Sequence, residues 1–138
     1  MNRIDFLKQL VLGCTLLFVP KHSSENTPRE TREIKFITPY IAGFQYYQGL
    51  ELEQRLKENE TLSLKREPQN RHDYNAIEVF RGDHKLGYIP RAENKLIARV
   101  MDQGMTVKAS ITRIDPEAIA NRRVKMKVFY EMVQDFKS

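Results

Sequence analysis

The sequence predicts a mainly β protein: a small antiparallel barrel of about six strands with one helix. Three observations predict this fold class. Short segments in which apolar and polar residues alternate recur between residues 34 and 133. Turn chemistry such as "RGDH" (81–84) separates two of these segments. Residues 90–104 instead show helical spacing of apolar residues. The resulting order, ββββαββ with short strands, is typical of a small barrel that a helix plugs or covers.

Six segments have the composition or the alternation of β-strands. They are rich in β-branched and aromatic residues, or they place an apolar residue at every second position. The first contains Pro39 and Gly43, which predict a bend or bulge. The third and fourth flank the "RGDH" turn, which predicts a hairpin. Residues 48–60 predict a loop with a short helical turn. The predicted strands are residues 34–47, 61–67, 76–80, 85–89, 106–114 and 124–133.

One helix is predicted between the fourth and fifth strands. Pro90 suits the first position of a helix, and Gly104 suits its end. The apolar residues between them share one face, which we expect to contact the barrel. These residues are Ala92, Leu96, Ile97, Val100 and Met101.

The composition is that of a soluble globular protein with an excess of positive charge. The chain has 138 residues, which predicts one domain with a buried core. The formal net charge of +5 favours an anionic partner such as nucleic acid or an acidic membrane surface. A merely solvated basic surface is the alternative. Residues 34–138 hold 18 Lys/Arg against 14 Asp/Glu, net +4, so the predicted domain carries most of the charge.

Sequence motifs of catalysis and metal binding are missing. The single cysteine, Cys14, excludes an internal disulfide and the cysteine-rich zinc sites, and the three histidines lack metal-ligand spacing. The sequence has no Walker phosphate loop, no Gly-x-Ser-x-Gly and no His-Glu-x-x-His. We therefore predict a protein that is not an enzyme and that uses no cofactor or metal.

The N-terminal segment has the features of a targeting sequence. Arg3 and Lys8 precede the apolar stretch "LVLGCTLLFV" (10–19), which Pro20 ends. This stretch is too short for a bilayer span of about 20 residues, but it matches the apolar region of a signal peptide. The stretch "NRIDFLK" (2–8) resembles the twin-arginine export motif, with an isoleucine in place of the second arginine.

Three regions follow from this pattern. Residues 1–19 are expected to be a leader that exports the protein to the cell envelope or attaches it to a membrane. An amphipathic helix packed on the domain of a cytoplasmic protein is the alternative. Residues 20–33 contain two prolines and no apolar periodicity, which predicts a linker. The folded domain is expected to span residues 34–133.

The loop "KREPQNRHDYN" (65–75) is dense in polar side chains. The turn formers Asn70 and Asp73 account for a tight connection. They account less well for the cationic and aromatic residues Arg66, Arg71 and His72. A basic loop with amide side chains suits a sugar–phosphate backbone, and a histidine ring can stack on a base. The loop is therefore either a ligand-binding rim or an ordinary solvated turn.

Two further segments carry candidate binding residues. On a strand, Tyr46 and Tyr47 point to opposite faces, so one of them can fill the core while the other offers a platform for a base. Two tyrosines that fill a barrel end are the alternative. Tyr88 ends a predicted strand, and Arg91 opens the helix, whose free N–H groups attract anions. A core Tyr88 and a solvated Arg91 are the alternative here.

Three separated segments resemble the HIRAN domain family in order and spacing. They are "AGFQYYQG" (42–49), "LSLKREPQNRHDYNAIEV" (62–79) and "KLGYIPRAEN" (85–94). The resemblance covers about residues 36–130. It implies an OB-like barrel that binds single-stranded DNA and favours a free 3′ end. The best-known members carry this domain at the N-terminus of helicase-like DNA remodelling proteins. This chain is similar to a short, free-standing bacterial form.

The resemblance also implies roles for single residues. Tyr46 falls on a base-stacking tyrosine, and Asn70 falls on an asparagine of the binding loop. Asp73 falls on an aspartate that holds the terminal 3′-hydroxyl, and Arg91 stands for a lysine that meets phosphate. Three positions depart from the family pattern. They are Gln45 in place of an arginine, His72 in place of a second stacking tyrosine, and Tyr88 in place of a histidine.

We therefore predict a non-catalytic module that binds single-stranded nucleic acid, DNA rather than RNA. One alternative is a protein-interaction or envelope-scaffold module that keeps the fold without binding DNA. A second alternative is an accessory subunit of a helicase-like ATPase. The candidate binding residues are Gln45, Tyr46, Tyr47, Arg66, Asn70, Arg71, His72, Asp73, Tyr88 and Arg91.

Overall fold

The computed structural model of the protein describes residues 30–134. The predicted leader, and with it the export motif, lies outside the described residues. Within residues 30–134 no helix is long and apolar enough to cross a membrane. The strands are β1 (Thr31–Ile37), β2 (Thr61–Arg66), β3 (Ile77–Arg81), β4 (His84–Tyr88), β5 (Val107–Ile114) and β6 (Val124–Val133).

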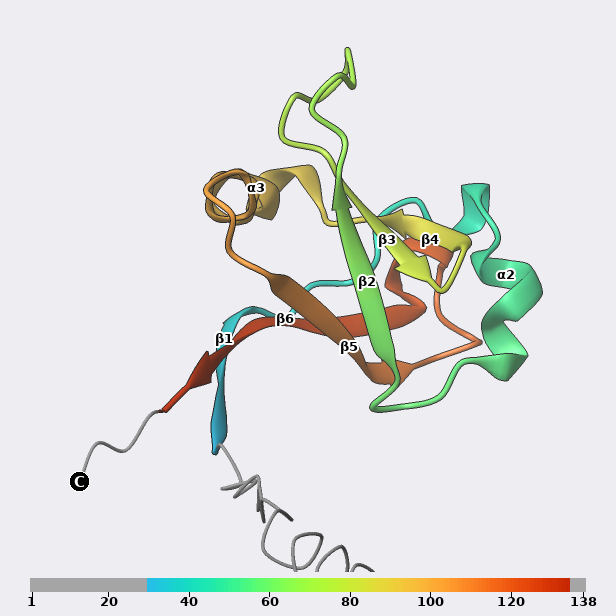
Figure 1. Ribbon diagram of the computed structural model, residues 1–138. Helices are drawn as coiled ribbons and strands as arrows, with labels where there is room; N and C mark the ends of the chain where they lie inside the picture. The colour runs from blue at the N-terminus through green and yellow to red at the C-terminus, as the bar shows by residue number, and fades with distance from the viewer. Residues whose placement is uncertain (1–29, 135–138) are drawn as a thin grey trace, which may run out of the picture.

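These six strands form one antiparallel sheet in the order β1-β6-β5-β2-β3-β4 (Figure 1). The sheet curls, and residues 39–42 connect β6, next to one end of the sheet, with β4 at the other end. Tyr40 forms an isolated bridge with Lys125 of β6, and Ala42 forms one with Tyr88 of β4. The predicted fold class, a small OB-like barrel of about six antiparallel strands, is confirmed as an open sheet that these bridges draw together.

Gly87 permits the approach of residues 39–42 to β4. The backbone N–H groups of Ala42 and Tyr88 each donate to the carbonyl oxygen of the other, at 2.8 and 2.9 Å. Gly87 lies at φ 153°, and a Cβ atom built there would overlap the carbonyl oxygen of Ala42. Any larger residue would therefore push the two segments apart.

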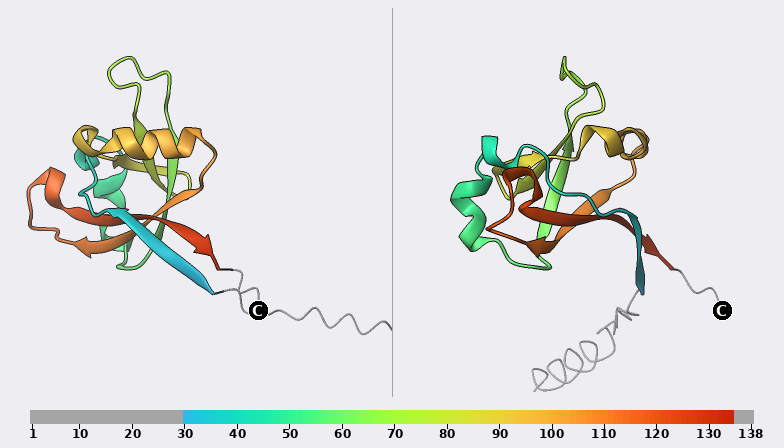
Figure 2. Two further views of the ribbon diagram at one scale, coloured as in Figure 1. Left: turned by 90° about the vertical axis from the view of Figure 1, so that its left-hand side faces the viewer. Right: turned by 180° about the vertical axis from the view of Figure 1, so that it is seen from behind.

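The core lies inside the curled sheet, and a helix covers one end of it. The helix α3 (Asn94–Asp102) lies across the sheet, on the side from which the β2–β3 loop projects (Figures 1 and 2). Each strand from β2 to β6 contributes apolar side chains to one buried cluster. Its fully buried members include Phe44, Leu62, Ile77, Val79, Leu86, Ile97, Ile111 and Met126.

The helix starts later than the sequence predicts. A 3-10 turn, η3 (Arg91–Glu93), follows Pro90, and the regular helix begins at Asn94. Of the predicted apolar face, Ile97 is buried and Val100 and Met101 pack against the core cluster, which confirms that part of the prediction. Ala92 and Leu96 are exposed, and Asn94 and Ala98 are buried in addition to Ile97, at i, i+3, i+4 spacing.

The predicted first strand is also wrong in extent. β1 begins at Thr31, inside the predicted linker, and ends at Ile37. Gly43 then adopts a left-handed conformation, φ 69°, and a 3-10 helix, η1 (Phe44–Tyr46), follows it. Tyr46 and Tyr47 therefore do not alternate across a strand. Neither tyrosine is in the core: 78% of Tyr46 and 37% of Tyr47 are exposed.

The helical turn predicted within residues 48–60 is confirmed. It consists of α2 (Gly49–Leu52) and the 3-10 helix η2 (Glu53–Arg55). The predicted hairpin of β3 and β4 and the last two predicted strands are confirmed as well.

Candidate nucleic-acid interface

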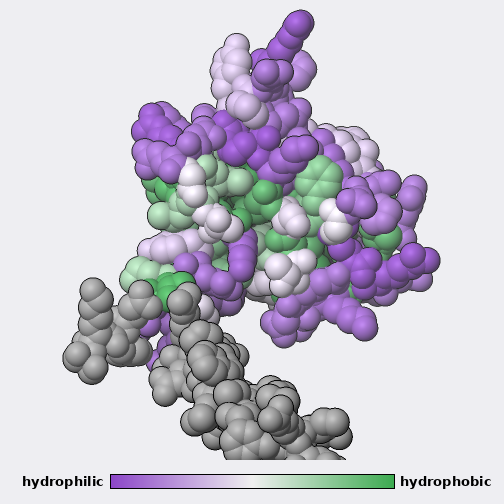
Figure 3. Space-filling model, viewed as in Figure 1, coloured by the Kyte–Doolittle hydropathy of each residue, from purple (hydrophilic) through white to green (hydrophobic). Residues whose placement is uncertain are grey.

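The loop between β2 and β3 is held by its own side chains. Oδ1 of Asn70 accepts hydrogen bonds from the backbone N–H groups of His72 (2.9 Å) and Asp73 (3.2 Å). Oδ1 of Asp73 accepts one from the N–H of Asn75 (2.9 Å). Asn and Asp side chains commonly stabilise turns in this way. The loop therefore has a defined shape, and it projects from the barrel as a hydrophilic extension (Figure 3).

Arg66 braces the base of this loop. Its guanidinium donates to the carbonyl oxygens of Ala76 (2.6 Å) and Tyr74 (2.9 Å). It also pairs with the carboxylate of Asp102, at the end of α3, with Nε 2.9 Å from Oδ1. An arginine has five N–H donors, and four hydrogen bonds within the protein leave little capacity for a ligand. The structure uses Arg66 to join the loop to α3.

The loop and the start of the helical segment enclose a pocket of about 450 Å³, which we call the loop pocket. Four of the predicted binding residues meet there: Arg71, His72, Asp73 and Arg91. The full lining is Arg71, His72, Asp73, Tyr74, Asn75, Arg91, Ala92, Asn94 and Lys95.

Asp73 connects the two walls of the loop pocket. Its Oδ2 accepts a 2.7 Å hydrogen bond from the side-chain amide of Asn94, which is 1% exposed. A carboxylate has about four acceptor positions. The bonds from Asn75 and Asn94 occupy two of them, so Asp73 retains the capacity to accept a hydrogen bond from a ligand hydroxyl.

The loop pocket carries positive charge that the protein does not neutralise. Residues 30–134 form seven ion pairs, and none of them uses Arg71, Arg91 or Lys95. An arginine without a protein partner can contact phosphate oxygens through two parallel N–H donors. Among the described residues, no three His, Cys, Asp or Glu side chains lie together as ligands for a metal ion. The lining is thus suited to hold an anion beside a hydrogen-bond acceptor.

Tyr47 and Tyr88 belong to a different cluster, around Lys85. Tyr88 donates its hydroxyl proton to Oε2 of Glu67 (2.7 Å) and accepts a hydrogen bond from Nζ of Lys85 (2.7 Å). The same Nζ lies 4.3 Å from the ring centroid of Tyr47 and 4.2 Å from that of Tyr88. The two rings meet edge to face, 5.7 Å apart. Both tyrosines are therefore engaged within the protein.

This cluster also shifts the pKa values of its members. The hydrogen bond from Tyr88 lowers the pKa of Glu67, and burial raises the pKa of neighbouring Glu78. Burial, together with the bond to Glu67, raises the pKa of Tyr88 far above its ordinary value. Tyr88 is therefore a neutral donor and Glu67 a carboxylate at neutral pH.

Comparison with known proteins identifies the family to which this fold belongs. The sequence profile described as the HIRAN domain matches residues 34–133. The chain belongs to the HIRAN domain family. The crystal structure of a protein from Lactobacillus plantarum is similar, with a TM-score of 0.64 and 27% identity, over 74% of this chain and 98% of that one. The crystal structure of the HIRAN domain of human HLTF has a TM-score of 0.56 and 20% identity, over 74% and 81%. Comparison with the curated proteins finds no match.

Tyr46 is the exposed aromatic residue that this HIRAN domain presents on η1. Within residues 30–134 its ring stacks on no other aromatic ring, and 78% of the residue is exposed to a ligand. Gln45 beside it is half-buried, and its Oε1 is buried without a hydrogen-bond partner among the described residues. Gln45 thus turns its carbonyl oxygen inward, whereas Tyr46 points outward.

Five residues that line the loop pocket were not predicted as binding residues: Tyr74, Asn75, Ala92, Asn94 and Lys95. Tyr74 is 73% exposed and adds a second aromatic side chain to the loop. Asn94 stands within the "KLGYIPRAEN" motif, and its position three and four residues before Ile97 and Ala98 was the available signal. A polar residue in the buried stripe of a helix requires a hydrogen-bond partner, which Asp73 supplies.

Proposed function

We propose that this HIRAN domain binds single-stranded DNA and takes its 3′ end into the loop pocket. The observation that carries the proposal is the group of unpaired cations around Asp73. Arg71, Arg91 and Lys95 suit backbone phosphates, because positive charges that neutralise phosphates release counterions and so favour binding. HIRAN domains are in general nucleic-acid-binding modules, which supports the proposal.

The position of Asp73 favours a strand end over an internal nucleotide. A carboxylate accepts a hydrogen bond from a 3′-hydroxyl but repels a phosphate at the same place. The hydrogen bond from Asn94 holds this carboxylate in the lining of the pocket. A free 3′-hydroxyl is therefore the group that fits beside Asp73, with the next phosphate among the three cations.

Exposed rings supply the contacts to bases. Tyr46 projects from η1, and His72 and Tyr74 project from the loop. Stacking on an aromatic side chain tolerates any base, because every base has a π-face. The proposed binding is thus largely independent of sequence.

The test compares single-stranded oligonucleotides that differ only in the 3′ group or the sugar. Fluorescence anisotropy at low salt should show micromolar-range binding of the free 3′-hydroxyl form by the full chain. A 3′-phosphate should weaken binding, and a matched RNA should bind less tightly than the DNA. Arg71→Ala and Arg91→Ala should each weaken binding.

The matched control is Lys57→Ala, because Lys57 is exposed in the turn before β2 and does not line the loop pocket. This variant should bind as the wild type does. A wild-type protein that binds none of the oligonucleotides would instead favour a protein-interaction module.

A further inference from the structure

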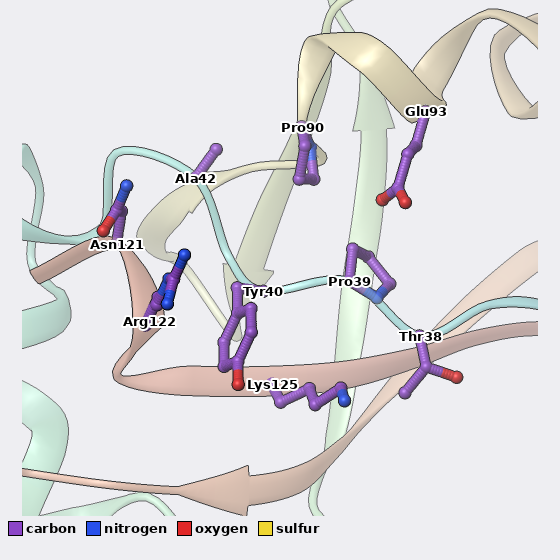
Figure 4. Close-up of a pocket in the computed structure, with 9 residues that line it drawn as sticks. All are labelled: Thr38, Pro39, Tyr40, Ala42, Pro90, Glu93, Asn121, Arg122 and Lys125. Carbon is purple, nitrogen blue, oxygen red and sulfur yellow. The ribbon is translucent and has the colours of Figure 1, made fainter. Parts of the chain in front are cut away.

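A second pocket lies on the other side of the η3 turn (Figure 4). It has a volume of about 420 Å³. Pro90 and Glu93 line this second pocket, whereas Arg91 and Asn94 of the same short segment line the loop pocket. The two pockets are thus neighbours. The lining of the second pocket is Thr38, Pro39, Tyr40, Ala42, Pro90, Glu93, Asn121, Arg122 and Lys125.

Main-chain hydrogen bonds make one wall of the second pocket rigid. The N–H of Ile41 donates to the carbonyl of Val124 (2.9 Å), and the N–H of Met126 donates to that of Pro39 (2.9 Å). Tyr40 and Lys125 are paired between these bonds, and Nζ of Lys125 lies 5.5 Å from the Tyr40 ring centroid. Figure 4 shows the ring and the lysine side chain next to each other in the pocket.

Two adjacent arginines at the start of β6 have different environments. Arg123 binds the carboxylate of Glu53 through Nε (2.7 Å) and Nη2 (2.9 Å), which anchors the end of the β5–β6 connection. Arg122 is exposed, and within residues 30–134 its guanidinium forms no ion pair or hydrogen bond. Lys125 likewise has no carboxylate partner in this range. The second pocket therefore offers two unpaired cations beside an aromatic ring.

We propose that the second pocket is an additional nucleotide subsite, through which the bound strand continues after it leaves the loop pocket. This inference rests on the proposed function. Arg122 and Lys125 contact backbone phosphates, and the ring of Tyr40, which lines the pocket, stacks on a base. The 3-10 helix η1, which carries the exposed Tyr46, lies next to η4 (Ala120–Arg122), which carries Arg122. In this proposal Tyr46 stacks a base next to the subsite.

The negative charge of Glu93 disfavours a phosphate in the second pocket, so a variant of Glu93 can test the proposal. Its carboxylate points into the second pocket from η3 (Figure 4). A passing phosphate is repelled by that charge, so neutralising Glu93 should strengthen the binding of any strand that runs through the pocket. Glu93 does not line the loop pocket, so a strand confined to the loop pocket should be insensitive to the change.

The experiment measures the affinity of the full chain for oligothymidylates with a free 3′-hydroxyl, from about two to about ten nucleotides long. In the wild type, affinity should rise with length to a plateau. Two added phosphate contacts should make the log–log salt slope of the longer strands more negative by about 1.4. The double variant Arg122→Ala/Lys125→Ala should bind the shortest strand with wild-type affinity. It should bind the longer strands no more tightly than the shortest one. Glu93→Gln should tighten only the longer strands, and Lys57→Ala should change neither.

The outcomes separate this subsite from the proposed function. The second pocket is not a subsite if the double variant keeps the full gain in affinity with strand length. The same conclusion follows if the wild type shows no such gain. In both cases the loop pocket still binds the strand. If no strand of any length binds the wild type, both the proposed function and the proposed subsite are wrong. Thermal denaturation of each variant checks that a lost gain is not caused by unfolding.

Discussion

The side-chain amide of Asn94 donates a 2.7 Å hydrogen bond to Oδ2 of Asp73. This bond joins an exposed loop to the buried face of α3. It also decides the geometry of the proposed site, because it fixes a loop carboxylate against a residue that is 1% exposed. The acceptor that we assign to the 3′-hydroxyl is therefore positioned by the core of the protein as well as by the loop.

Asp73→Asn should reduce the preference for a free 3′-hydroxyl over a 3′-phosphate and leave overall affinity similar or higher. The asparagine oxygen can still accept from the N–H of Asn75, while the negative charge that repels phosphate is removed. Anisotropy titrations of wild type and variant with two oligonucleotides that differ only in the 3′ group measure the effect. If the wild type shows no preference, the role assigned to Asp73 is wrong.

Asn94→Ala should lower the free energy of unfolding by about 1–3 kcal/mol, because it leaves Oδ2 of Asp73 without its partner and empties a buried position. Lys95→Ala is the neighbouring control. Lys95 is exposed and unpaired among the described residues, so its loss should change stability by less than about 0.5 kcal/mol. Lys95→Ala should nevertheless make the salt slope of binding less negative by about 0.7. Urea denaturation and binding titrations separate the two effects.

Tyr46→Ala should weaken strand binding by about 1–3 kcal/mol, which is the usual value of stacking one base on an aromatic ring. Tyr46→Phe should retain most of the affinity, because it keeps the ring. Tyr46 is 78% exposed, so neither change should disturb the fold. Equal losses in the two variants would show that the hydroxyl group, not the ring, makes the contact.

Tyr88→Phe should raise the pKa of Glu67 toward its ordinary value, because the hydrogen bond from Tyr88 is the main cause of its lowering. A carboxyl whose pKa is lower in the folded than in the unfolded protein stabilises the fold above its unfolded pKa. That contribution is lost as the pH falls through the folded pKa. The stability difference between wild type and Tyr88→Phe should therefore be greatest near neutral pH and shrink in acid.

NMR titration of the Glu67 carboxyl and denaturation at several pH values measure this effect. A stability difference that is constant across the acid range would contradict the role of the Tyr88–Glu67 bond.

Much of the barrel could be predicted because alternation is a local property of a strand. Leu62 and Leu64 alternate within β2, and the last strand alternates from Val124 to Val128. The helix was placed correctly, and Ile97, Val100 and Met101 of its predicted face contact the core, but its first predicted turn, Arg91–Glu93, is a tighter 3-10 turn. Leu96, at the edge of the predicted face, is exposed.

Four residues of the loop pocket could be predicted from the sequence, but which of the predicted residues the protein itself engages could not. Arg66 and Arg71 look equivalent in sequence, yet Asp102, which lies 36 residues after Arg66, engages only Arg66. Tyr88 is withdrawn from the loop pocket by its bond to Glu67, 21 residues before it in the chain. Such pairings depend on how distant strands meet. No local pattern encodes them.

The most direct test of the proposed function is the salt dependence of binding to a short DNA strand with a free 3′-hydroxyl. With two to four phosphates contacted from the loop pocket, the log–log slope for the wild type should lie between about −1.4 and −2.8. Arg91→Ala should make that slope less negative by about 0.7. Binding that does not change with salt, or that is equal in wild type and Arg91→Ala, would contradict the assignment of the loop pocket to a nucleic-acid strand.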